Sequence, residues 1–143
     1  MGKKLIIKGA DFFANAISSV VSLYESDIMS SNQFIIQNGV AKANTTGYKG
    51  GFIDIRTYSE SELVIKTKAS ATFSRISFVT ALPSQVDEAI QFASGYSASN
   101  MFVEVSTGST STVNVPSNAN YIYVMYYNSG AGGNIFPEDM YLK

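Results

Sequence analysis

The sequence contains no histidine and no cysteine. Without histidine there is no usual general base, the commonest metal ligand is missing, and no Ser-His or Cys-His nucleophile pair can form. Without cysteine there is no disulfide and no thiolate chemistry, and zinc would have only carboxylate ligands, which suit it poorly. We therefore expect a protein that is not an enzyme and that needs no cofactor and no metal ion.

Charge and long apolar runs are also scarce. Only 15% of the 143 residues are charged, and 10 Lys and Arg against 11 Asp and Glu leave a formal net charge of -1. A chain without a basic patch is not expected to bind nucleic acid. No apolar stretch approaches the roughly 20 residues of a membrane span, and the run Leu5-Ile6-Ile7 is too short for a signal peptide. We expect neither a membrane nor a nucleic acid as partner.

Carboxylates are the remaining groups that could carry chemistry. The candidates for the acid and base of a glycoside hydrolase are Asp54, Asp87, Glu88, Glu104, Glu138 and Asp139. Their spacing selects no pair, so we interpret them as solvent-facing charges that keep sheet edges soluble. They also lack the spacing of a calcium-binding loop. The glycine-rich segments 47–51 and 128–134 lack the Gly-Lys-Ser/Thr element of a phosphate-binding loop and are interpreted as turns.

From Gly51 onward, apolar residues recur with a period of two, which is typical of β-strands. Strands are predicted over 53–58, 63–68, 75–79, 90–93, 101–105, 112–115, 121–127 and 140–142. Turn signals at roughly ten-residue spacing favour a sandwich or barrel. The only place for a helical turn among these strands is Gln85 to Phe92. We predict an all-β fold, namely an antiparallel jelly-roll β-sandwich over residues 34–143. The strand pattern that supports this prediction runs from Gly50 to Lys143.

The residues before this region are more heterogeneous. Phe34 to Gln37 is predicted as a strand that ends at the turn Asn38-Gly39, and residues 43–51 as a loop. Residues 1–33 are predicted as an N-terminal arm or anchor. A helix from Phe12 is one alternative there, because five residues share a helical face: Phe13, Ile17, Val20, Val21 and Tyr24. Its β-branched residues and serines favour a structured arm instead, and both alternatives stay open.

Tyrosine is abundant, with nine Tyr and nine Phe but no Trp. Tyrosine packs its ring on apolar surfaces while its hydroxyl still reaches water or a partner. One interpretation is that loop tyrosines stack on sugar rings, and the best placed are Tyr48, Tyr58, Tyr96 and Tyr127. The other places them in sheet packing or in a subunit interface. Because carbohydrate sites usually rely on Trp, the absence of Trp favours the second interpretation.

Two motifs carry a resemblance to known proteins. The opening, Lys3 to Phe12 (KKLIIKGADF) followed by Asn15-Ala16-Ile17, resembles the start of small structural proteins of Bacteroides phages and prophages, including crAss-like phages. The segment Val113 to Val124 (VNVPSNANYIYV) is similar to a hairpin of jelly-roll modules in phage fibre and tail proteins. Related sandwiches occur in carbohydrate-binding modules. The short chain leaves little room for a fibre shaft.

The resemblance implies a component of a phage virion, made in the bacterial host cytoplasm. It would be a capsid decoration, a head fibre or a short tail-fibre component, and a homo-oligomer, with a trimer favoured. Its N-terminal arm would dock on other virion proteins and its sandwich would be displayed. The assembly residues of the arm would be Leu5, Ile6, Ile7, Phe12, Phe13 and Ile17. The alternative is a carbohydrate-binding module or adhesin domain whose glycan ligand contacts the four tyrosines named above.

Overall fold

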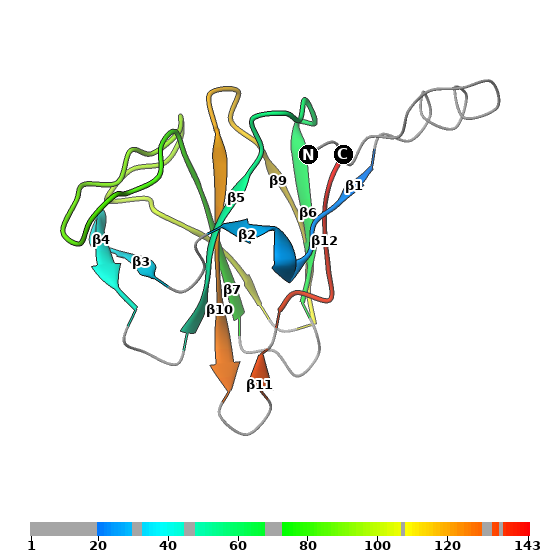
Figure 1. Ribbon diagram of the computed structural model, residues 1–143. Coiled ribbons are helices and arrows are strands. Elements are labelled where there is room, and N and C mark those ends of the chain that lie inside the picture. The colour runs from blue at the N-terminus through cyan, green and yellow to red at the C-terminus, as the bar shows by residue number, and fades with distance from the viewer. Residues whose placement is uncertain are drawn as a thin grey trace.

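Two antiparallel β-sheets and a β-hairpin make up the fold (Figure 1). The computed structural model describes residues 20–29, 33–44, 48–67, 73–106, 108–129, 133–134 and 136–143. The first sheet, called here the terminal sheet, has the strand order β1 (Val21–Ser22), β12 (Asp139–Leu142), β6 (Glu62–Lys66) and β9 (Thr110–Asn114). The second, the central sheet, has the order β2 (Ile28–Met29), β5 (Tyr48–Asp54), β10 (Tyr121–Ser129), β7 (Phe73–Val79) and β8 (Val103–Ser106), and β11 (Gly133–Asn134) pairs with β10. The hairpin consists of β3 (Phe34–Gln37) and β4 (Val40–Ala43).

The prediction of an all-β fold with antiparallel sheets is confirmed. Every strand pairing in the described part of the chain is antiparallel. The only helical element among the described residues is the 3₁₀ turn η1 (Glu25–Asp27). The period-two pattern of most strand sequences is the cause, because alternate residues of a strand point to the same face and can bury an apolar side there.

Apolar side chains from both sheets form the first core, which lies between them. The terminal sheet supplies Leu63 and Ile65 from β6, and the central sheet supplies Phe78 from β7 and Ile122 and Val124 from β10. These five side chains are completely buried. Burial of one such side chain contributes about 1.5–3 kcal/mol, so this contact holds the two sheets together.

The opposite face of the central sheet is buried as well. Tyr121, Tyr123 and Met125 of β10 belong to a second core together with Ile36 and Ala41 of the hairpin. The ring of Tyr123 lies 5.2 Å from the ring of Phe52, and its hydroxyl accepts a hydrogen bond from the Ile36 N–H at 3.3 Å. The hairpin and residues 80–102 cover this face as a third layer (Figure 1). This explains why the sequence of β10 is apolar or aromatic on both faces.

Residues 85–93 form neither the strand predicted over Ile90–Ala93 nor the helical turn predicted over Gln85–Phe92. They make isolated bridges, in which Ala89 pairs with Val40 and Phe92 with Val79. The Ala41 N–H donates to the Glu88 carbonyl, and the Ile90 N–H donates to the Gly39 carbonyl. The backbone groups of this segment are therefore satisfied by the hairpin and by β7 instead of by a continuous strand or a helix.

The prediction of a loop over residues 43–51 is wrong in its second half, because β5 begins at Tyr48 and runs through Gly50 and Gly51. These glycines lie opposite Met125 and Val124 of β10. A Cβ atom on Gly50 would meet the Val124 carbonyl oxygen at 1.9 Å. Glycine serves here for close approach of two backbones and not for a turn.

The helical alternative for the N-terminal segment is wrong from Val21 onward, because Val21–Ser22 is a strand. Residues 20–29, called here the strap, place β1 at the edge of the terminal sheet and β2 at the edge of the central sheet. The Leu23 side chain belongs to the first core, and its N–H donates to the Met140 carbonyl at 2.7 Å. The predicted arm up to residue 19, with all six of its assembly residues, lies outside the described residues.

Candidate functional site

The connection from β9 to β10 crosses between the sheets, so the hairpin that the resemblance implies at this position is wrong. β9 pairs with β6 in the terminal sheet, whereas β10 pairs with β5 and β7 in the central sheet. Pro116 lies two residues after Asn114, the last residue of β9, as expected of a residue that cannot donate to a ladder. The Ala119 N–H donates to the Pro116 carbonyl at 3.0 Å. The resemblance therefore places a turn here correctly, but the strands on either side of it lie in different sheets.

A second connection, from β5 to β6, crosses between the same two sheets beside the first. The Ile55 N–H donates to the Asn120 carbonyl at 3.0 Å, and the Val115 N–H donates to the Ser61 carbonyl at 2.8 Å. These bonds join the two connections, 55–61 and 115–120, which we call the crossovers. Together they cover one end of the first core.

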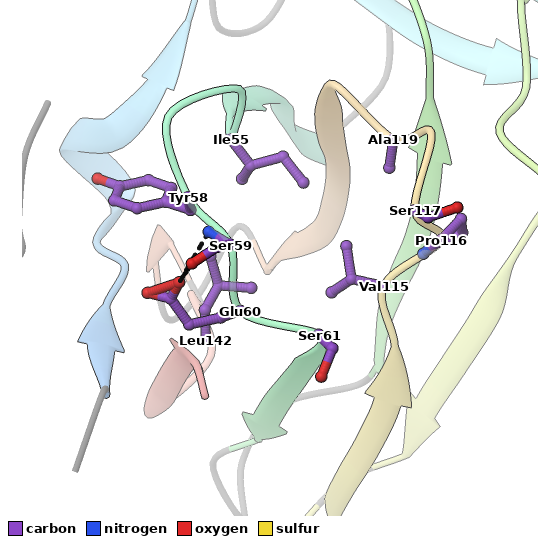
Figure 2. A pocket seen from close by; sticks show the side chains of 10 residues that line it. All are labelled: Ile55, Tyr58, Ser59, Glu60, Ser61, Val115, Pro116, Ser117, Ala119 and Leu142. Atoms are coloured by element: carbon purple, nitrogen blue, oxygen red, sulfur yellow. Dashed lines mark hydrogen bonds between the residues drawn. The ribbon is translucent and has the colours of Figure 1, made fainter. Parts of the chain in front are cut away.

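A cavity of about 290 Å³ lies between the crossovers (Figure 2). Its floor is apolar and is formed by Ile55, Val115, Ala119 and Leu142; of these, Ile55 and Leu142 are buried. Tyr58 stands on one side of the opening and Pro116 with Ser117 on the other (Figure 2). Ser59, Glu60 and Ser61 complete the lining. We call this the crossover cavity.

The serines of the crossover cavity, Ser59, Ser61 and Ser117, are exposed, whereas Glu60 is half-buried and its Oε1 atom is buried. Glu60 is the only charged residue among the described residues that line it. The Ser59 N–H and hydroxyl donate to Glu60 Oε2 at 2.9 and 3.4 Å. Since the one formal charge is negative, the cavity is unsuited to an anion, and its floor suits an apolar or ring-shaped group.

The four predicted glycan-contact tyrosines do not form one patch. Tyr58 lines the crossover cavity, and Tyr96 packs edge-on against Phe78 with ring centroids 5.4 Å apart, where burial raises the pKa of its hydroxyl. Tyr48 packs against the second core, on the other face of the central sheet. Tyr127 belongs to β10, and its side chain lies outside the described part of the structure. Of the three tyrosines whose side chains are described, only Tyr58 borders the crossover cavity.

Sequence reasoning missed the other residues of the crossover cavity. The sequence predicts Ile55 and Leu142 as strand residues, and the resemblance places Ser117 and Ala119 within a hairpin. The strand assignments do not say which connections lie side by side. The only available signal was that both connections join apolar strands through turn-forming residues, which does not identify a cavity.

Five of the six candidate carboxylates take part in separate ion pairs or hydrogen bonds, and the sixth, Asp139, is an exposed residue of β12. Arg56 holds Asp54 with a contact of 2.6 Å, and this hydrogen bond keeps the pKa of Asp54 below its ordinary value. Glu104 pairs with Arg75 at 2.9 Å and Glu138 with Lys66 at 3.6 Å. Asp87 pairs with Lys42. Glu88 accepts from the Ser84 N–H and hydroxyl and from the Gln85 N–H, which lowers its pKa.

Within the described ranges, no group of three or more acidic residues gathers where it could hold a metal ion. Nor does the described part of the chain contain a helix of sufficient length and apolarity for a membrane crossing. No protein-family model, curated protein or solved structure matches the chain.

Proposed function

We propose that this chain is a structural protein of a phage virion: a capsid decoration, a head fibre or a short tail-fibre component. It docks on other virion proteins through the N-terminal segment, residues 1–19 with the strap behind them, and displays the sandwich. The resemblance of the opening Lys3–Phe12 motif supports the virion assignment. The homo-oligomer, with a trimer favoured, is part of the same proposal.

The observation that carries the docking role is the strap. β1 pairs with β12 in the terminal sheet and β2 pairs with β5 in the central sheet, so residues 20–29 are fixed to both sheets. A segment that continues from a fixed edge transmits its attachment to the whole sandwich. Within the strap, Val20 and Tyr24 are the exposed apolar or aromatic side chains, at 49% and 59% exposure.

We infer further that the sandwich is a jelly roll. The order of the terminal sheet places β12, the last strand, between β1 and β6, and the order of the central sheet places β10 between β5 and β7. A late strand inserted between two earlier ones is what Greek-key connections produce, and a jelly roll consists of two Greek keys in eight strands. Four strands of each sheet supply that number: β1, β12, β6 and β9 with β5, β10, β7 and β8.

The docking role can be tested by light scattering during size-exclusion chromatography. The full chain is expected to elute with a multiple of its 15.4 kDa mass, and replacement of Leu5, Ile6 and Ile7 by serine is expected to reduce the oligomer to monomer. Val86→Ser is the matched control, because it removes an apolar side chain that is 46% exposed on the sandwich. A parent chain that stays monomeric at every concentration would contradict the proposal.

The virion location needs a separate measurement. Gold-labelled antibodies raised against the sandwich are expected to decorate intact particles of the phage that encodes the chain, as seen by electron microscopy. Particles from a phage that lacks the gene are the control. Absence of label on intact and on detergent-opened particles would overturn the virion assignment.

A carbohydrate-binding or adhesin role is the second candidate, and Tyr58 is the observation that favours it. Its ring borders the crossover cavity together with the hydroxyls of Ser59, Ser61 and Ser117, and an aromatic ring beside hydroxyl groups can hold a sugar. The test is a glycan array with the full chain, Tyr58→Ala and the control Tyr48→Ala. A glycan signal that Tyr58→Ala leaves unchanged, or no signal at all, rejects this candidate.

A further inference from the structure

We propose that the crossover cavity receives the Phe12–Phe13 pair of a second copy of this chain, so that the N-terminal segment of one copy docks on the sandwich of the next. This inference rests on the proposed assembly role of that segment and names the surface that receives it. It assigns the cavity to a protein side chain and not to a sugar.

The position of the strap is the first argument. Val21 of β1 is the register partner of Leu142 of β12, and Leu142 lines the crossover cavity. The chain therefore leaves the sandwich next to the cavity, at the exposed residue Val20. Phe13 precedes Val20 by seven residues, which span at most about 25 Å when extended.

The N-terminal segment leaves the sandwich close to the crossover cavity, and this favours an exchange of segments between copies. If copies associate through this end of the sandwich around a common axis, each segment reaches the cavity of the next copy over a short distance. Such a head-to-tail contact closes into a ring, which is the geometry expected of a cyclic homo-oligomer. A segment that inserts into its own sandwich would instead leave the chain monomeric.

The chemistry of the cavity is the second argument. Its floor is made of aliphatic side chains, and Glu60 Oε2 already accepts two hydrogen bonds from Ser59. A phenylalanine ring requires no polar partner, whereas a sugar requires fixed donors and acceptors. No amide or guanidinium side chain belongs to the described lining. At about 290 Å³, the cavity lies just below the range of about 300–1,000 Å³ typical of ligand pockets, which fits an inserted side chain better than an oligosaccharide.

The absence of cysteine makes cross-linking the sharpest test. A full chain carrying Phe13→Cys is mixed with a full chain carrying Ser117→Cys, at the rim of the cavity, under mild oxidation. We expect a mixed disulfide dimer as the main product on a non-reducing gel. The control partner carries Ala43→Cys, an exposed residue on the hairpin, and is expected to give at least tenfold less mixed product. Equal yields with both partners would overturn the proposal.

The same two substitutions in one chain show whether the cavity is filled by the segment of the same copy or of another copy. We expect Phe13→Cys with Ser117→Cys to produce covalent oligomers. A product that stays at the mass of one chain and loses both free thiols would show that the segment occupies its own cavity, and would overturn the exchange between copies.

A filled cavity tests the same contact without cross-linking. Ala119→Phe places a ring in the cavity, and Ala43→Phe adds the same ring on the exposed hairpin as control. We expect Ala119→Phe to shift the oligomer to monomer and Ala43→Phe to leave it unchanged, both with the circular dichroism spectrum of the parent. Ala119→Val, a smaller change, is expected to weaken the oligomer if Ala119→Phe fails to fold.

The outcomes separate this inference from the proposed function. An oligomer that survives Ala119→Phe but is lost in Phe12→Ala with Phe13→Ala means that the segment assembles elsewhere; the inference falls and the assembly role stands. A parent chain that is monomeric removes both. Glycan binding that Ala119→Phe abolishes while the oligomer persists means that the cavity is a sugar site, which also overturns the inference.

Discussion

At the residue scale, Gly50 of β5 leaves no room for a side chain between its own backbone and that of β10. Its φ of +144° is a conformation that side-chain-bearing residues rarely adopt, and an added Cβ would lie 1.9 Å from the Val124 carbonyl oxygen and 2.8 Å from the Met125 Cα. Both neighbours are backbone atoms of β10, so no side-chain rotation relieves the overlap. We expect Gly50→Ala to lower the free energy of unfolding by about 3 kcal/mol or more, as measured by urea denaturation.

Gly95 is the matched control for that substitution. It also has a positive φ, +88°, but no atom lies within 4 Å of the position of its Cβ. Gly95→Ala should therefore cost only the backbone strain, about 1–2 kcal/mol. If the two variants lose equal stability, backbone conformation and not the approach of β5 to β10 determines the cost.

Two buried tyrosine hydroxyls make stability depend on alkaline pH. Burial raises the pKa of Tyr123, and burial together with the hydrogen bond to Glu25 raises the pKa of Tyr126. An unfolded tyrosine ionises near pH 10, whereas the folded ones keep their protons to higher pH. The unfolded state thus binds fewer protons above pH 10, and stability falls there by about 1.4 kcal/mol per pH unit for each such tyrosine.

The measurement compares urea denaturation at pH 9, 10 and 11 in the parent and in Tyr123→Phe with Tyr126→Phe. The double variant is expected to be less stable at pH 9, because the Ile36 N–H and Glu25 lose a partner, but to depend less steeply on pH above 10. Parallel pH profiles would show that neither hydroxyl determines the alkaline loss.

The hairpin, at the element scale, is held on the central sheet by two buried side chains, Ile36 and Ala41. Ile36 on β3 is 3% exposed and packs into the second core, whereas its neighbour Gln37 is exposed. We expect Ile36→Ala to lower the free energy of unfolding by about 3 kcal/mol and Gln37→Ala to change it by less than about 0.5 kcal/mol. Equal small effects would mean that the hairpin does not contribute to cooperative unfolding.

Individual elements were largely predictable from the sequence, because their signals are local. Three of the predicted strands correspond to β6, β7 and β10 (Glu62–Lys66, Phe73–Val79 and Tyr121–Ser129). Asn38 and Gly39 adopt φ of +53° and +77°, as a tight hairpin turn requires. The burial of β10 on both faces also follows from its sequence. What covers its second face does not, since Ile36 precedes Tyr123 by 87 positions.

The arrangement of strands was not predictable in the same way. β10 and β5 read as separate strands, and nothing local says that Gly51 lies opposite Val124. The crossover cavity depends on this arrangement, because its lining comes from residues 55–61, 115–119 and 142. The Pro116 turn illustrates the limit: its residues predict a turn correctly, but whether the turn ends in the same sheet is decided by strand partners more than forty residues away along the chain.

The whole molecule is closed by contacts between its first and last described strands. Ser22 of β1 lies opposite Tyr141 of β12, at a separation of about 4.5–5.5 Å between Cα atoms in such pairs. That range permits a disulfide, and a chain without cysteine offers no competing partner. We expect Ser22→Cys with Tyr141→Cys to oxidise quantitatively within one chain.

This disulfide would join residues about 120 positions apart, and restriction of the unfolded chain over so long a loop stabilises by about 4–5 kcal/mol in the entropic model. The oxidised variant should therefore unfold at higher urea concentration than its reduced form, and reduction should return it close to the parent. Because the disulfide lies on the C-terminal side of Val20, it leaves residues 1–19 able to assemble, and the oligomer should persist. An oxidised variant that unfolds like the reduced one would mean that the strap separates from β12 before the sheets do, and the N-terminal segment would then lack the fixed edge that its docking role requires.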